Sequence, residues 1–168
     1  MSAQRSRASL IVRSFLGAIW FAAWFFVIFP GLVLWASDSL LPPPLGPRVA
    51  LGVSLILLAH YVLLQHMAAF IIVGEGTHVP IDPPGKLVVR GLYRRVRNPM
   101  YLVYVVIILG EALIFRSWWL LVYAAGFWGL AHFFLVVFEE KQTRARFGEE
   151  WDAYAREVSR WLPGKPRG

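Results

Sequence analysis

Four long stretches of apolar residues constrain the fold of this chain more than any other feature. They are Leu10–Leu34, Val49–Val73, Met100–Phe115 and Trp118–Phe138. A helix needs about 20 residues to cross the roughly 30 Å of hydrocarbon in a bilayer. The first, second and fourth stretches are long enough; the third is short, so it spans marginally, starts within the preceding polar residues, or is broken. The sequence therefore predicts an all-α polytopic membrane protein with about four transmembrane helices.

The lysines and arginines lie in groups between these stretches, and the groups predict the orientation. With both termini in the cytoplasm, 15 of the 17 basic residues are inside, and only Arg48 and Arg116 are outside. Cytoplasmic loops carry an excess of Lys and Arg. We therefore expect cytoplasmic N- and C-termini and an active site facing the cytoplasm, at the inner membrane if the source is bacterial. This topology also accounts for the net charge of +7, so no nucleic-acid partner is expected.

The composition excludes several other classes of protein. Hydrophobic residues make up 58% of the chain and charged residues 16%, which is too apolar for a small soluble domain. The lack of cysteine excludes disulfides, thiolate catalysis, thiolate metal sites and a prenylation box. The length fits one domain, 1–168. Within it we expect residues 1–73 to form two helices and residues 74–163 to form the functional core.

The connections between the stretches differ in character. Ser37–Pro47 contains three consecutive prolines and should be a stiff external connector without helix. Gly74–Arg97 is long for a compact protein, and such loops are usually functional. Arg116-Ser117 alone separates the third and fourth stretches, which predicts a tight hairpin. After it, four apolar residues recur at helical spacing and predict a cytoplasmic C-terminal amphipathic helix: Phe147, Trp151, Tyr154 and Val158.

Three polar segments on the predicted cytoplasmic side carry residues suited to chemistry: Gly85–Tyr93, Arg97–Tyr101 and Glu139–Tyr154. Each has a simple structural explanation by itself. Asn98 and Pro99 are favoured residues at a helix start, tyrosines are common at the membrane interface, and Glu139 and Glu140 can form a solvated helix end. However, acidic residues at a helix C-terminus oppose the helix dipole, so the placement of this pair is unexpected.

Taken in order, the segments read Gly-x-Leu-Val-x-x-Gly-x-Tyr, Arg-Asn-Pro-x-Tyr opening an apolar helix, Glu-Glu, Phe-Gly-x-x-Trp-x-x-Tyr and Arg-Trp-Leu-Pro. This order resembles the isoprenylcysteine carboxyl methyltransferase and phospholipid methyltransferase superfamily, over roughly Gly74–Pro163. Its members are small integral membrane enzymes that use S-adenosylmethionine. The resemblance implies methyl transfer to a membrane-embedded or apolar acceptor, such as a carboxylate, an amine or a lipid headgroup.

The resemblance also implies which residues hold the cofactor. By matching position these are His78, Lys86, Leu87, Val88, Tyr93, Asn98, Pro99, Met100, Tyr101 and Glu139. A carboxylate can accept hydrogen bonds from ribose hydroxyls or the methionyl ammonium. Tyrosine faces suit adenine or the sulfonium cation, and free N–H groups at a helix start suit the methionyl carboxylate. We expect Glu140 and Arg146 to orient the polar group of the acceptor.

Two positions depart from the carboxyl methyltransferases of this group. Asn98 stands where most of them have histidine, and an amide keeps hydrogen bonding but does not change charge near neutral pH. Leu135 and Val136 occupy the region where the prenylcysteine enzymes carry an arginine. Both departures disfavour isoprenylcysteine as the substrate.

Other polar residues in the apolar stretches suggest no further site. His60 and His66 are six residues apart, so on a helix they point about 120° apart, and we expect no metal site there. Glu111 should lie near the outer end of the third helix and pair with Arg116. Two alternatives to methyl transfer stay open, an NADPH-dependent membrane reductase of related architecture and a non-catalytic membrane scaffold. The acceptor and the oligomeric state are also left open.

Overall fold

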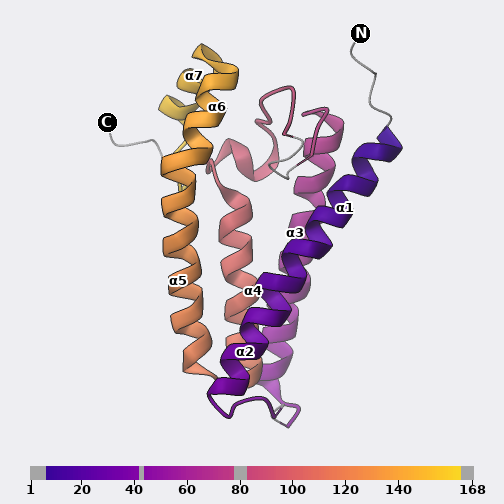
Figure 1. The fold of residues 1–168 in the computed structure, drawn as a ribbon, viewed down its shortest axis with the longest axis vertical. Helices are drawn as coiled ribbons and strands as arrows, with labels where there is room; N and C mark the ends of the chain where they lie inside the picture. Colours follow the sequence, from indigo (N-terminus) through magenta and orange to yellow (C-terminus); the bar gives the residue numbers. More distant parts are fainter. Residues whose placement is uncertain (1–6, 42–43, 78–82, 164–168) are drawn as a thin grey trace.

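The computed structural model describes residues 7–41, 44–77 and 83–163, which are mainly helical and include no strand. In chain order the elements are α1 Arg7–Ala23, η1 Trp24–Ile28, α2 Phe29–Ala36, α3 Pro47–Ile72, η2 Gly91–Arg94, α4 Pro99–Phe115, α5 Trp118–Phe134, η3 Leu135–Glu139, α6 Glu140–Phe147 and α7 Glu149–Glu157. Figure 1 shows α3, α4 and α5 side by side, with α1 and α2 crossing them obliquely. The all-helical class predicted from the apolar stretches is confirmed.

Two long helices each contain a π-helical turn. α1, η1 and α2 run on as one helix, and so do α5, η3 and α6. Pro30 explains the first π turn, because its ring lacks an N–H and clashes with the carbonyl four residues earlier, so the helix widens there. The second turn, η3, contains no proline and ends at Glu139. Single π turns inside α-helices are frequent at functional sites.

Within the described residues, three helices are long and apolar enough to cross a membrane: Ala8–Ala36, Pro47–Ile72 and Trp118–Phe147. α4 is apolar too, but its 17 residues extend only about 25 Å. Apolar side chains such as those of Trp20, Leu57 and Leu130 are more than 60% exposed. Because a water-soluble protein rarely exposes so much apolar surface, the chain is an integral membrane protein.

α4 is the central helix of the bundle. It packs against α3 and α5, while Phe21 and Phe25 of the first helix pack against the cluster around Ile108. Buried residues lie along the whole of α4: Pro99, Met100, Val103, Ile107, Ile108, Gly110 and Ala112. Its first turn is therefore fixed at one end of the bundle.

α3 and α4 approach closely where two glycines face each other. A Cβ atom on Gly52 would lie 2.6 Å from the carbonyl oxygen of Gly110, and one on Gly110 would lie 2.9 Å from the carbonyl oxygen of Gly52. Small residues at helix interfaces allow such backbone contact in membranes.

Gly52→Ala is expected to lower the free energy of unfolding by about 2 kcal/mol, because overpacking would force α3 and α4 apart. Denaturant unfolding in mixed micelles would measure the loss. Gly126→Ala in α5 is the matched control, since a Cβ there meets nothing within 4 Å and alanine favours the helix. Equal losses in both variants would contradict the close contact.

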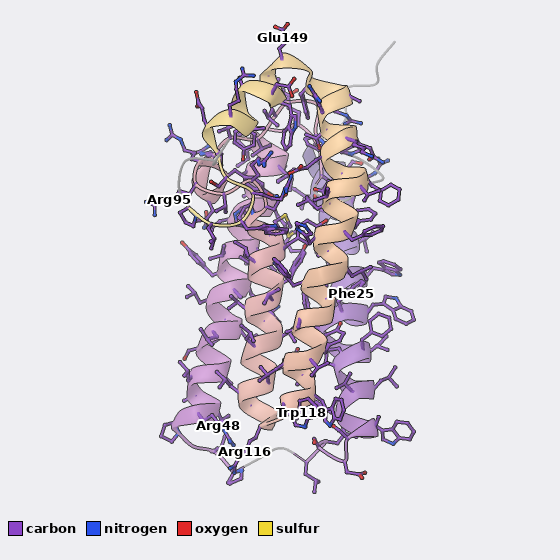
Figure 2. The ribbon with its side chains drawn as sticks, turned by 90° about the vertical axis from the view of Figure 1, so that its left-hand side faces the viewer. Phe25, Arg48, Arg95, Arg116, Trp118 and Glu149 are labelled. Carbon is purple, nitrogen blue, oxygen red and sulfur yellow. The ribbon has the colours of Figure 1, made fainter. Side chains whose placement is uncertain are left out.

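The two ends of the bundle differ in what they carry. One end of the bundle holds the start of α1, the end of α3, the segment before α4, and α6 and α7 (Figure 1). The other end holds the connector after α2 and the two-residue link between α4 and α5. Figure 2 shows Arg48 and Arg116 at this second end, opposite Glu149. The hairpin of α4 and α5 through Arg116-Ser117 is as predicted.

The C-terminal segment does not form one continuous helix. α6 and α7 are separated at Gly148, whose φ of 52° and ψ of −124° are strained for residues other than glycine. The predicted apolar spacing nevertheless marks the packed side of the segment: Trp151, Tyr154 and Val158 are buried together, with Leu87 and Phe147 against them. The segment thus packs on the residues that precede α4.

The expected ion pair between Glu111 and Arg116 is not formed. Glu111 lies in the last turns of α4, and its buried Oε2 has no hydrogen-bond partner. Arg116 instead ends the helix in the left-handed region with φ 51°, which directs its exposed side chain away from the bundle (Figure 2).

Candidate active site

Residues distant in sequence converge where α4 begins. Val96 forms an isolated parallel bridge with Ser159, and the backbone N–H of Arg97 donates to the carbonyl of Ser159 at 2.8 Å. The Tyr154 hydroxyl donates to the carbonyl of Tyr93 at 2.6 Å within the core. These bonds hold the C-terminal segment against the start of α4, beside the end of η3.

The centre of this region is a contact between a tyrosine and a carboxylate. The hydroxyl of Tyr101, in the first turn of α4, donates to Oε2 of Glu139 at 2.6 Å. Tyr104 lies one turn further along α4, with its ring edge-on to Tyr101 at 6.2 Å. Burial and then the negative charge of Glu139 raise the pKa of Tyr93 well above its ordinary value. One tyrosine thus binds the carboxylate directly, with Tyr104 packed beside it and Tyr93 within reach of its charge.

The neighbouring glutamate is engaged in a separate network. Successive helical residues point about 100° apart, so Glu140 faces segment 158–161 while Glu139 faces Tyr101. Arg160 binds Glu140 through two bonds, from Nε at 2.9 Å and from Nη2 at 2.8 Å. Arg97 lies 3.5 Å from the same carboxylate and also over the ring of Trp151. Both oxygens of Glu140 are therefore occupied. The side chain links α6 to Arg160 in segment 158–161 and to Arg97 just before α4.

Asn98 and Pro99 occupy the helix-start positions that the sequence predicts, but Asn98 does not cap the helix with its side chain. Its amide nitrogen instead donates to the carbonyl of Arg160 at 3.3 Å. The first backbone N–H groups of α4 are therefore left without a side-chain acceptor from the N-cap.

The other residues predicted to contact the cofactor fall into three groups. Val88 and Met100 are buried with Tyr93 in one cluster, against which Tyr104 packs. Lys86 pairs with Glu75 on the surface, and Leu87 packs on the α7 cluster. His78 lies outside the described residues.

Arg146, predicted to orient the acceptor, is exposed and donates to the carbonyl of Pro84 at 3.0 Å. The structure thus brings together Val88, Tyr93, Met100, Tyr101 and Glu139, and places Lys86 and Arg146 at the periphery.

Sequence reasoning missed an aromatic group beside the site. The Trp161 indole N–H donates to Nδ1 of His132 at 3.0 Å, and Trp128 stacks on His132 at 5.6 Å. Trp161 also contacts the ring of Tyr101 edge-on at 6.4 Å. Trp128 and His132 are four residues apart, which is one helical turn, but nothing in the sequence indicates that Trp161 folds back onto them.

Tyr154→Phe is expected to lower the free energy of unfolding by about 1–2 kcal/mol, because it leaves the buried carbonyl of Tyr93 without its donor. A thermal melt in lipid nanodiscs would detect the loss. Tyr61→Phe, on the exposed face of α3, is the control and should not change the melting temperature. An unchanged melt for Tyr154→Phe would argue against this hydrogen bond.

A comparison with curated proteins finds no significant match. A comparison with family models finds that of the phospholipid methyltransferases over residues 47–150. The matched region runs from the start of α3 into α7, so it holds α4, η3 and the contact between Tyr101 and Glu139. It covers more than half of the chain. The chain therefore belongs to the phospholipid methyltransferase family.

Proposed function

We propose that this membrane methyltransferase uses S-adenosylmethionine to methylate a membrane-embedded or apolar small molecule through a carboxylate, an amine or a lipid headgroup. The observation that carries the proposal is the partly buried carboxylate of Glu139, which Tyr101 binds at the start of α4 with Tyr104 packed edge-on beside Tyr101. The family match contributes the reaction type.

The residues present fit this cofactor. Glu139 offers the acceptor that ribose hydroxyls or an ammonium group need. The rings of Tyr93, Tyr101 and Tyr104 offer faces for adenine or for a sulfonium cation. The uncapped N–H groups at the start of α4 suit a carboxylate. The carboxylate, the ammonium or sulfonium cation and the adenine ring of the cofactor thus each have a partner within one site.

The reaction needs little acid–base catalysis from the protein. S-adenosylmethionine supplies a methyl group on a sulfonium, which is a good leaving group for in-line displacement by an acceptor that is already nucleophilic. Alignment of the reactants can contribute about 7–11 kcal/mol. The tyrosines and the packed segment 158–161 would supply this alignment and exclude water. Glu140 is better suited to holding that segment than to contacting the acceptor.

We further propose four spans, with both termini and the site in the cytoplasm. α4 is enclosed by other helices, so its short length is compatible with a span whose ends are completed by the segments around it. The site end carries most of the basic residues, as the positive-inside rule requires. The lipid bilayer would then deliver the acceptor from the side while the cofactor enters from the cytoplasm.

The test uses the full chain in lipid nanodiscs. S-adenosylmethionine and its demethylated product should raise the melting temperature, because a ligand of the folded state stabilises it, whereas NADPH should not. Membranes that contain the protein should transfer labelled methyl from the cofactor to a lipid-extractable acceptor. Folded protein that binds neither form of the cofactor would contradict the proposal, and stabilisation by NADPH alone would favour a reductase.

A further inference from the structure

Two hollows open on the face that α3, α4 and η2 form together. The larger, of about 740 Å³, lies along the second half of α3 and is closed by the residues around η2. The smaller, of about 240 Å³, lies along the first half of α4 and ends at Pro163. Leu92 and Arg95 line both hollows, so the two meet at Arg95.

The linings differ in polarity. The lining of the larger hollow combines apolar residues, which include Val62, Ala69 and Ile72, with the basic residues Arg90 and Arg95. Gln65 adds an amide to the same lining. The smaller hollow is lined by aliphatic side chains and proline, with Arg95 as its single charged residue. A ligand that fills both is therefore apolar over most of its length and anionic at the junction.

Arg90 and Arg95 have no acidic partner among the residues that the structure describes. Both side chains are exposed, and Figure 2 shows Arg95 projecting from the side of the bundle, toward the end that carries α7. At that level the apolar surface of the helices gives way to charged residues, which is where phospholipid headgroups lie.

We propose that this face binds one anionic phospholipid, with its phosphate between Arg90 and Arg95 and its two acyl chains in the two hollows. Basic pockets beside transmembrane helices suit anionic headgroups. Ile72 in the lining of the larger hollow and Leu64 on the same helix are both exposed apolar residues, so this hollow opens to the surface that acyl chains cover. A protein partner would need acidic side chains on an apolar, membrane-level surface, which is a less common combination.

The lipid site adjoins the candidate active site but does not contain its central contact. Pro99 lines the smaller hollow, whereas neither Tyr101 nor Glu139 lines either hollow. His66 lines the larger hollow and contacts the ring of Tyr93 edge-on at 5.3 Å. The two sites thus touch through this pair of rings, and lipid binding can be measured without the methyl donor.

The test compares short-chain phosphatidylglycerol, phosphatidylcholine and inorganic phosphate as ligands of the full chain in detergent, by native mass spectrometry. Wild-type protein should retain one phosphatidylglycerol in preference to phosphatidylcholine. The double variant R90Q/R95Q should weaken phosphatidylglycerol binding by about 30-fold. R94Q removes one positive charge from a neighbouring residue that lines neither hollow and should stay within about twofold of wild type.

Ala68→Phe provides a test that leaves every charge in place. Ala68 lines the larger hollow and is exposed, so a phenyl ring there should weaken phosphatidylglycerol binding even if the arginine variant fails to fold. Equal affinity for the two lipids would overturn the proposal. So would equal losses in R94Q and R90Q/R95Q, binding of inorganic phosphate as tight as that of the lipid, or unchanged binding in folded Ala68→Phe.

Discussion

Glu139→Ala is expected to reduce the affinity for S-adenosylmethionine by at least about 100-fold. Removing one partner of a hydrogen-bonded charge pair in a desolvated site costs 2–5 kcal/mol or more, and about 2.7 kcal/mol corresponds to 100-fold. The Glu139 carboxylate is partly buried and receives the Tyr101 hydroxyl, so it is already oriented for the cofactor. Isothermal titration in lipid nanodiscs with the demethylated product would measure the loss without turnover.

Two further variants separate this effect from a general change of charge. Tyr101→Phe keeps the aromatic face but removes the hydroxyl that orients Glu139, so it should cost about five- to tenfold in affinity. Glu149→Ala removes a carboxylate from the exposed first turn of α7 and should leave the affinity unchanged. Wild-type affinity in folded Glu139→Ala would exclude a role for this carboxylate in cofactor binding.

Glu140→Ala is expected to cost about 3 kcal/mol of folding free energy. The side chains of Glu140 and Arg97 are 14% and 12% exposed, and breaking a buried ion pair by removing one partner typically costs 3–5 kcal/mol. We place the loss at the lower limit because Arg160 is 33% exposed and can be hydrated. The segment 158–161 should also become sensitive to protease, because its side-chain link to α6 is lost.

Asp152→Ala is the matched control for this prediction. Asp152 pairs with Arg144, but the Arg144 side chain is 67% exposed, and exposed ion pairs contribute less than about 1 kcal/mol. Chemical unfolding and limited proteolysis of the two variants in the same micelles would compare them. Similar losses of folding free energy in both variants would mean that Glu140 is not the link between α6 and segment 158–161.

The sequence predicted the helices well because apolar length is a local property. The hairpin at Arg116-Ser117 and the start of α4 at Pro99 could be placed within a residue or two from apolar runs and helix-start residues alone. The cluster of Trp151, Tyr154 and Val158 followed from helical spacing, although the break at Gly148 did not, since a glycine on an exposed face is also tolerated within a helix at a modest cost.

The partners of the two glutamates could not be predicted in the same way. Nothing local distinguishes Glu139 from Glu140, so both were expected to serve the reaction. Their roles diverge because Arg160 returns from 20 residues further on to bind only one of them. Similarly, Asn98 was expected to cap α4 with its side chain, but the same returning segment offers it a carbonyl. Contacts of this range depend on how the chain closes and leave no periodic signal.

The widened turn at Leu135–Glu139 makes the site sensitive to insertions and deletions in an uneven way. A π turn absorbs one extra residue while the helices before and after it keep their alignment. Loss of one residue from Leu135–Phe138 should therefore let the helix run regularly, with the acidic pair still facing its partners. One residue added within α5 would not be absorbed in this way. It would rotate the helix that follows by about 100° and turn Glu139 away from Tyr101. This stretch should therefore tolerate the loss of one residue better than the gain of one.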